Sequence, residues 1–270
     1  MKKVMMIVGI AGGVIIAPIM YDNSSVYAQQ NNEKYQVIKR NSFGAAEHIV
    51  FSENSGINHE NFITELKKEF NFSDRDKLVL KSSNKDNKGF VHYKYKQLYL
   101  DIPVFGGECI IHEKNGKAIS LNCKIYPKLS INTQPTITKE KSIENAMKYI
   151  GLSKYRWQDT AWEKSLKMKV KNPNASYYLT PELVIAPLNG VYKLENFRLC
   201  WKLNILGVKL EQAWTVFIDA HNGQLVNKIS LVKDADVTAT VNTLYNGPQN
   251  IKVWHEPLNS LYPEFDTCHF

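Results

Sequence analysis

The chain has 270 residues, of which 44% are hydrophobic, enough to bury one or two small cores. Its 34 basic and 26 acidic side chains give a formal net charge of +8. Because the basic residues are scattered, with only a loose cluster at 164–171, the charge argues against a nucleic-acid partner and favours an acidic protein surface.

The first 28 residues have the pattern of a secretory signal peptide. Lys2 and Lys3 precede an uncharged apolar run at 4–20, and a small residue at Ala28 predicts cleavage before Gln29. An uncleaved membrane anchor is the alternative, since the run is near the shortest length that spans a bilayer. A Gly-Gly pair and a proline within the run favour cleavage. We expect a secreted or periplasmic product without stable membrane association.

A polar leader then gives way to a helical pattern at 58–70. Phe62, Leu66 and Phe70 recur every four residues, and Asn58 is placed to cap the first turn. A polar turn region at 81–89 follows. This pattern predicts one amphipathic helix.

The next segment, 90–127, alternates as strands do. It bends at Pro103 and at Gly106-Gly107, and Asn115-Gly116 signals a tight two-residue hairpin turn. If the hairpin carries one extra residue near the turn, as a bulged hairpin does, five apolar residues share one face of the sheet, which would be the core face. They are Cys109, Ile111, Ile119, Leu121 and Cys123. We expect a curved sheet that wraps the preceding helix.

Four cysteines in an exported chain can oxidise, in any of three pairings. Cys109 and Cys123 could face each other across the hairpin, where facing Cα atoms are about 5.5 Å apart and within reach of a disulfide. Two buried free thiols are the competing interpretation. Cys200 and Cys268 remain, in different regions of the chain.

A second helix-and-sheet unit begins near residue 138. Thr138 is a plausible N-cap, Gly151 suits the C-cap, and the helix between them carries an apolar stripe. The stripe consists of Ile143, Ala146, Met147 and Ile150. Strand patterns follow at 176–185, 197–205 and 212–219, and the last turns at Asn222-Gly223 into 225–231.

These patterns predict an α+β fold of two small units, each a helix packed on a mainly antiparallel curved sheet. The expected divisions are a signal peptide at 1–28, a first unit at 29–130, a second unit at 131–236 and a further segment at 237–270.

The usual catalytic motifs are missing from the sequence. Each His-Glu pair would need a second histidine four residues after the first to build a zinc-protease helix. The pairs begin at His59, His112 and His255, and the fourth positions hold Ile63, Gly116 and Asn259. There is no Gly-x-Ser-x-Gly elbow and no phosphate-binding glycine loop. We therefore expect no active site and no metal in this chain.

The segment 91–122 resembles the propeptide module of fungalysin and thermolysin. That module has a conserved run ending in Pro-Val-Phe-Gly-Gly, followed by a hairpin with a histidine before an Asn/Asp-Gly turn. The corresponding positions are His92, Gln97, Tyr99, Ile102, Pro103, Val104, Phe105, Gly106, Gly107, His112 and Gly116.

The second unit is similar to a PepSY-type domain. Most of that likeness lies in Arg198-Leu199-x-Trp201 and in Asp219-Ala220-x-x-Gly223. Together the two resemblances cover about residues 36–231. Their order is that of the pro-region of secreted thermolysin-like zinc metallopeptidases, and 235–254 resembles the first β-hairpin of the mature peptidase in that family.

The resemblance implies that this chain assists folding of a thermolysin-like peptidase domain and keeps it inactive, in cis or in trans. Zinc and calcium are expected only in the catalytic part, whose zinc-binding helix would lie beyond Phe270, as in a truncated precursor. Processing is expected between Asp236 and Val237, with Val232 as a second choice. Two alternatives are a stand-alone exported inhibitor that acts in trans and an unrelated binding module built from the same hairpins.

Overall fold

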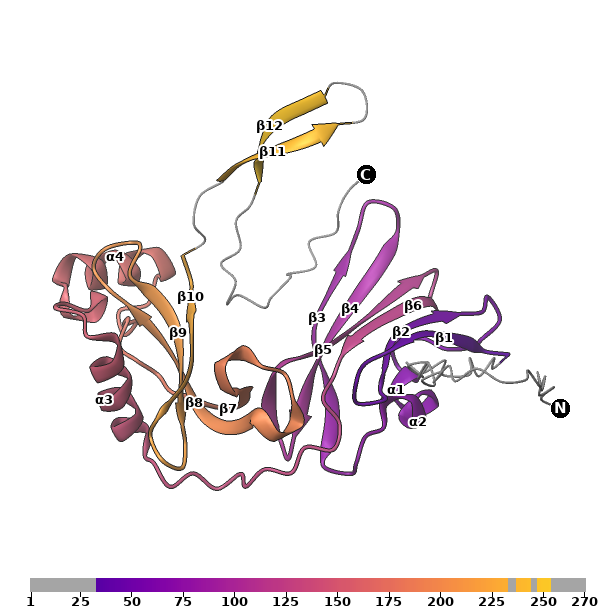
Figure 1. Cartoon of the computed structure of the whole chain (residues 1–270), viewed down its shortest axis with the longest axis horizontal. Coiled ribbons are helices and arrows are strands. Elements are labelled where there is room, and N and C mark those ends of the chain that lie inside the picture. The colour runs from indigo at the N-terminus through magenta and orange to yellow at the C-terminus, as the bar shows by residue number, and fades with distance from the viewer. Residues whose placement is uncertain (1–32, 233–236, 244–246, 254–270) are drawn as a thin grey trace, which may run out of the picture.

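The structure, a computed structural model, describes residues 33–232, 237–243 and 247–253. Ten strands within residues 33–232 form one continuous sheet, which is mainly antiparallel (Figure 1). They are β1 (Tyr35–Arg40), β2 (Ala46–Phe51), β3 (Asp76–Lys85), β4 (Phe90–Tyr99), β5 (Ile102–Lys114), β6 (Lys117–Lys124), β7 (Glu182–Pro187), β8 (Phe197–Leu206), β9 (Ala213–Asp219) and β10 (Leu225–Ser230). The predicted α+β class with mainly antiparallel pairing is confirmed.

The helices lie beside this sheet, and a separate hairpin follows it in the chain. The helices are α1 (Phe62–Glu65), α2 (Lys67–Phe70), α3 (Lys139–Ile150) and α4 (Thr160–Val170). Single 3₁₀ turns occur at Arg156–Gln158, Leu188–Gly190 and Leu194–Asn196. The hairpin pairs β11 (Val237–Thr243) with β12 (Gly247–Val253).

The N-terminal part of the sheet has the order β1-β2-β6-β5-β4-β3, with α1 and α2 packed beside β1 and β2 (Figure 1). Phe62, Leu66 and Phe70 are fully buried, as the four-residue spacing predicts. The single helix predicted over 58–70 is wrong, because the backbone leaves helical geometry at Leu66 and separates α1 from α2. Packing outweighs propensity in so short a segment. The Asn58 side chain accepts hydrogen bonds in the turn before α1, and Asn61 is the N-cap.

The β5–β6 hairpin turns at Asn115 and Gly116, both with positive φ, as a tight two-residue turn requires. The register shifts by one residue after His112, so the expected bulge is present. Its extra residue is Ile119, which is 41% exposed, and Ala118 takes the buried position. The expectation that Ile119 faces the core is therefore wrong, because the bulge turns it outward.

The C-terminal part contains β7, β8, β9 and β10, covered by α3. The Thr138 side chain accepts a hydrogen bond from the Lys141 backbone N–H, and Gly151 ends α3 at a φ of 67°. Ile143 and Ala146 are buried. Both predicted caps and the apolar stripe are confirmed.

One predicted strand and one predicted turn in this part need correction. The strand expected over 176–185 begins only at Glu182, because side chains bind the preceding backbone: Glu163 accepts from the Tyr177 N–H, and Ser176 accepts from the Tyr178 N–H. The turn at Asn222-Gly223 belongs to a longer loop, in which the Asp219 N–H bonds to the Gln224 carbonyl. Helix α4 was not predicted at all.

The two parts meet through β5. Its long middle pairs with β4 and β6, and at Val104 it forms one parallel bridge to Ile185 of β7. Each part keeps a buried cluster of its own, one around Phe62 and Ile111 and one around Trp201 and Val216. The two helix-and-sheet units predicted from the sequence thus share one sheet.

Candidate functional site

Most of the residues that resemble the propeptide module gather where β4 and β5 separate. Lys96 pairs with Glu108 and Leu98 pairs with Pro103, so residues 104–107 of β5 stand opposite Gln97 alone. This bulge of four residues separates β5 from β4, and Val104 forms its bridge to β7 there. We call residues 97 and 103–107 the joint, because they connect the two parts of the sheet.

Gln97 fills the opening at the joint. Its side chain is fully buried and bonds to both backbone groups of Tyr126: Oε1 accepts from the N–H at 2.9 Å, and Nε2 donates to the carbonyl at 2.8 Å. Nε2 also donates to Asp76 Oδ1 at 3.1 Å. The amide therefore replaces a strand neighbour for Tyr126.

The two positions of the joint that hold glycine exclude a side chain for different reasons. Gly106 has a φ of 76°, and a side chain there would meet the Tyr192 hydroxyl. Gly107 lies against Gln97, leaving no room for a side chain. Next to them, Phe105 packs on Phe217 of β9 with ring centroids 4.6 Å apart, which couples the joint to the C-terminal part.

An aromatic cluster covers the joint. The Tyr126 ring stacks on Tyr192 at 5.2 Å and packs against Phe197 at 4.8 Å. Burial raises the pKa of Tyr126 far above its ordinary value, and its buried hydroxyl has no hydrogen-bond partner among the described residues. Tyr99, also fully buried, accepts a hydrogen bond from Arg75 at 3.2 Å. These groups stabilise the fold and offer no reactive pair.

Three histidines form a hydrogen-bonded chain on the opposite face of the β-sheet from the buried core. His48 Nδ1 lies 2.8 Å from Asn122 Oδ1, and Asn122 Nδ2 lies 3.1 Å from His112 Nε2. His112 Nδ1 lies 2.6 Å from His92 Nδ1, and His92 Nε2 lies 3.4 Å from Asp86. With neutral rings, hydrogen-bond donation can run in one direction from His48 to Asp86, which gives both ring nitrogens of His112 and of His92 a partner. Burial, then His92 and His48, lower the pKa of His112 to about 4.

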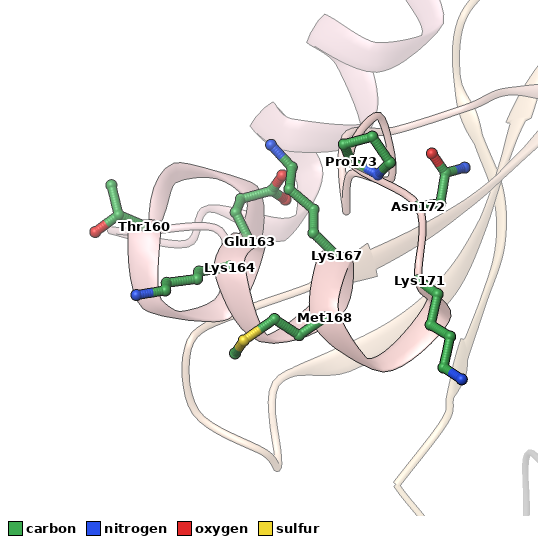
Figure 2. Close-up of a pocket in the computed structure, with 8 residues that line it drawn as sticks. All are labelled: Thr160, Glu163, Lys164, Lys167, Met168, Lys171, Asn172 and Pro173. Carbon is green, nitrogen blue, oxygen red and sulfur yellow. The ribbon is translucent and has the colours of Figure 1, made fainter.

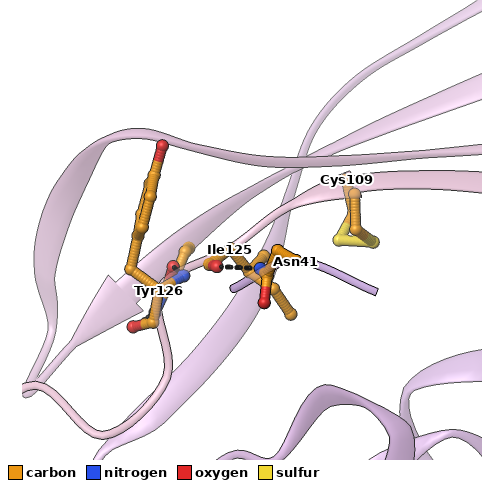
Figure 3. The surroundings of a disulfide bond; sticks show 6 residues. Asn41, Cys109, Ile125 and Tyr126 are labelled. Atoms are coloured by element: carbon orange, nitrogen blue, oxygen red, sulfur yellow. Dashed lines mark hydrogen bonds between the residues drawn. A yellow bond between two sulfur atoms is a disulfide. The ribbon is translucent and has the colours of Figure 1, made fainter. Parts of the chain in front are cut away.

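Cys109 and Cys123 are directly opposed across β5 and β6 and form a disulfide inside the N-terminal core. Figure 3 shows it near Asn41, whose amide donates to the Ile125 carbonyl at 2.9 Å. Cys200 is buried in β8, where burial raises the pKa of its thiol well above the ordinary value. A neutral, covered thiol is a packing group and no nucleophile.

The residues that resemble a PepSY-type domain attach α3 to the strands. Trp201 donates to the Ile137 carbonyl at 2.7 Å, just before the helix. Asp219 accepts from the N–H groups of His221 and Asn222, shaping the loop, and Gly223 accepts from Asn145 of α3 at 3.0 Å. The Arg198 guanidinium bonds to the carbonyls of Glu195 and Phe197.

The two His-Glu pairs within the described residues begin at His59 and His112, and both histidines have side-chain partners. His59 pairs with Glu113, which is 3% exposed, and stacks on Tyr93. No group of three or more His, Cys, Asp or Glu suited to a metal ion occurs among the described residues. Nor does any helix of the described ranges have the length and apolarity needed to cross a membrane.

Several predicted positions lie outside the described residues: the cleavage site at Ala28 and Gln29, Asp236, His255 and Cys268. Val237 is the first residue of β11, where it pairs with Val253.

A surface hollow with a volume of about 520 Å³ lies on α4. Lysines at 164, 167 and 171 line it together with Met168 (Figure 2). Three of the four lysines of the loose basic cluster at 164–171 therefore line one hollow.

Comparison with known proteins identifies part of this framework. Residues 76–124 match the Fungalysin/Thermolysin Propeptide Motif. This range begins with β3 and ends with β6, so it contains the joint, the disulfide and the pair His92–His112. The resemblance to a thermolysin-type propeptide region is confirmed, whereas the PepSY-type resemblance of the second unit stays a prediction.

Curated relatives extend the similarity along the chain. Bacillolysin of Brevibacillus brevis is 26% identical over 188 residues, covering 67% of this chain and 31% of that protein. An extracellular elastase of Staphylococcus epidermidis is 25% identical over 201 residues, covering 72% of this chain and 35% of that protein. The chain thus matches about a third of the length of each relative.

Among solved structures, the Bacillus megaterium YpeB C-terminal domain aligns with a TM-score of 0.32 at 14% identity. The alignment covers 69% of this chain and 72% of that chain. A score this low does not establish a shared fold.

Proposed function

We propose that this chain is the pro-region of a secreted thermolysin-like metalloendopeptidase, which assists folding of the peptidase domain and keeps it inactive until cleavage. The match over 76–124 carries the proposal. The names of the relatives, bacillolysin and extracellular elastase, agree with it. The zinc and calcium of such an enzyme would belong to the peptidase domain, and the second unit would be the PepSY-type part of the pro-region.

The geometry supports a framework role. The side chains at the joint are committed to internal contacts, such as Gln97 with Tyr126 and Phe105 with Phe217. The free thiol Cys200 is covered, and the histidines bond to one another. A chain organised in this way acts through its surface, by binding a partner in the folded state and stabilising that state by mass action.

A refolding experiment tests this function. The peptidase domain of Brevibacillus brevis bacillolysin is denatured and diluted with or without an equimolar amount of the full chain, and the recovered cleavage of a peptide substrate is measured after the chain has been digested. We expect a higher recovered activity with the chain. The same amount of albumin is the control, and equal recovery in both would contradict the folding role.

Inhibition is measured separately, on the peptidase that is already folded. Slowing of the folded enzyme without any gain in refolding would instead identify a stand-alone inhibitor that acts in trans. Translating the nucleotide sequence beyond the codon for Phe270 addresses the relationship in cis, where a His-Glu-x-x-His helix is expected.

A further inference from the structure

Helix α4 is attached to the molecule along one side only. Asp159 caps its first turn by accepting from the N–H groups of Ala161 and Trp162. The Trp162 ring packs under the Arg156 guanidinium, 4.2 Å from the ring centroid, and Arg156 is itself bonded to the Gly207 carbonyl. No residue of α4 is fully buried. The helix is held in place while its outer side stays open to a partner.

The outer side carries a concentrated positive charge. Residues 160–173 hold four lysines and one acid, Glu163, so their net charge is +3. Glu163 accepts from the Tyr177 N–H at 2.8 Å. We call Lys164, Lys167, Met168 and Lys171 the lysine face. The three- and four-residue spacing places the first three on one side of α4, and Lys171, the residue that follows the helix, lines the same hollow.

The lysines of this face form no salt bridge among the described residues. Nine other lysines of the described chain do form them. They are Lys34, Lys39, Lys67, Lys77, Lys81, Lys94, Lys141, Lys154 and Lys202. The positive charge at the lysine face is therefore left for an outside partner or for solvent.

The shape of the face suits contact with another molecule. The lysines and Met168 surround the hollow described above, and the chain closes its end by turning at Lys171, which has a φ of 53° (Figure 2). Met168 is 65% exposed and Val170 is 50% exposed. An exposed thioether between ammonium groups gives an adaptable apolar contact inside a charged rim.

We propose that the lysine face is a docking surface for a carboxylate-rich protein surface. Resting on the proposed function, we assign that surface to the peptidase domain. Ammonium groups without partners match exposed Asp and Glu side chains, and such complementarity steers association and fixes orientation. The basic second unit would thereby contact the enzyme through α4, at a place far along the chain from the joint.

Other polyanions fit the face less well. A helix that lies on a membrane presents a broad apolar side, whereas here Met168 stands alone between lysines. Single-stranded nucleic acid is bound with aromatic side chains on which bases stack, and the face has none. Lysine also gives point charges that pair readily with scattered carboxylates.

The test uses the full chain with lysines 164, 167 and 171 changed to glutamate together. The matched control changes Lys85, Lys88 and Lys117 to glutamate, which alters the net charge equally at exposed positions of the β3–β4 tip and the β6 start. Inhibition of Brevibacillus brevis bacillolysin and of the Staphylococcus epidermidis elastase is measured at about 20 mM and about 0.3 M salt, where screening differs strongly. Circular dichroism and thermal midpoints show that each variant is folded.

We expect the unchanged chain to inhibit at low salt and the control variant to inhibit equally well. The lysine-face variant should inhibit at least roughly tenfold more weakly. The added salt should weaken inhibition by the unchanged chain and leave inhibition by the lysine-face variant almost unaffected. Equal inhibition by the folded lysine-face variant and the control would overturn the docking surface and leave the proposed function standing. Absence of inhibition by the unchanged chain would contradict both.

Discussion

Gly107 and Gln97 lie so close together that a β-carbon on Gly107 would be 2.8 Å from both Cβ and Oε1 of Gln97. The absence of a side chain at Gly107 therefore leaves the space that the Gln97 side chain occupies. Because Gln97 can enter the joint, its amide holds the backbone of Tyr126, and β5 can leave β4 to reach β7. The Gly-Gly of the propeptide motif is in this way a condition for joining the two parts of the sheet.

Replacing Gly107 by alanine is therefore expected to destabilise the chain by about 2–3 kcal/mol, as overpacking of a close contact does. Urea denaturation followed by circular dichroism measures the change. Gly89→Ala is the control, since its φ of 84° costs only backbone strain and nothing lies within 4 Å. In a Gln97→Ala background the added cost of Gly107→Ala should fall below about 0.5 kcal/mol. A full cost in that background would show that Gln97 is not the obstacle.

Gln97→Leu tests the other side of the contact. Leucine fits the volume but leaves the Tyr126 N–H and carbonyl without their side-chain partners in a buried place. We expect a loss of about 2–4 kcal/mol in the free energy of unfolding. Gln134→Leu, at an exposed position, is the matched control and should change stability by less than about 0.5 kcal/mol. Similar values for the two variants would refute this role of Gln97.

Local features of this fold could be predicted from the sequence, and long-range ones could not. Thr138, Gly151 and the Asn115-Gly116 turn act on their own neighbours, so their chemistry is visible in a few residues. The bond between Gln97 and Tyr126 spans 29 residues, and the bridge between Val104 and Ile185 depends on strands that are distant in the chain. Nothing in a local pattern specifies such pairings.

The errors have a similar origin. The four-residue spacing of Leu66 from Phe62 and Phe70 predicts a continuous helix, yet the backbone bends at Leu66, where its side chain packs in the core. Helix α4 has a weak apolar stripe because it buries no residue fully, so its lysines look like scattered charge. The hydrogen-bonded histidines come from β2, β4 and β5, and only the sheet register shows that they are neighbours. The motif match nevertheless points to His92 and His112 as related positions.

The histidine chain predicts loss of stability in acid. His112 is held neutral in the folded state, with its pKa lowered to about 4, whereas an unfolded histidine titrates near 6.5. Below about pH 6.5 the unfolded state therefore binds a proton that the folded state does not. Stability is fully present above that pH and falls as the pH drops toward 4, by about 3 kcal/mol at roughly 1.36 kcal/mol per pKa unit. Urea midpoints at pH values from 7.5 to about 4 measure the slope.

The control for this slope removes the group that titrates. His112→Gln keeps a polar side chain beside His92 and Asn122, and it should flatten the loss between about pH 6.5 and 4 relative to the unchanged chain. His221→Gln changes a histidine in the C-terminal loop and should leave the slope in place. An identical slope in His112→Gln would assign the acid sensitivity to other groups.

Reduction of the disulfide should weaken the N-terminal part. Cys109 and Cys123 are 14 residues apart in sequence, and closing a loop of that size stabilises a fold by about 3 kcal/mol in the chain-entropy model. We expect Cys109→Ala with Cys123→Ala to lower the free energy of unfolding by about 2–4 kcal/mol. Dithiothreitol should then have no further effect on that variant. Cys200→Ala, at a buried free thiol, should remain sensitive to the reductant.

Processing at the end of the second unit gives the last prediction. Strand β10 ends at Ser230 and β11 begins at Val237, so the candidate bond before Val237 lies at the border of the next hairpin. Thermolysin-like enzymes, as the resemblance implies, prefer a bulky apolar residue after the cleaved bond. A trace of bacillolysin should therefore produce a new N-terminus at Val237 first and at Val232 second, and N-terminal sequencing over time gives the order. Val237→Asp should slow the first cut, whereas Thr238→Asp, one position further on, should slow it less. Initial cuts within residues 104–121 or 215–229, with the 231–236 segment intact, would contradict the predicted processing site.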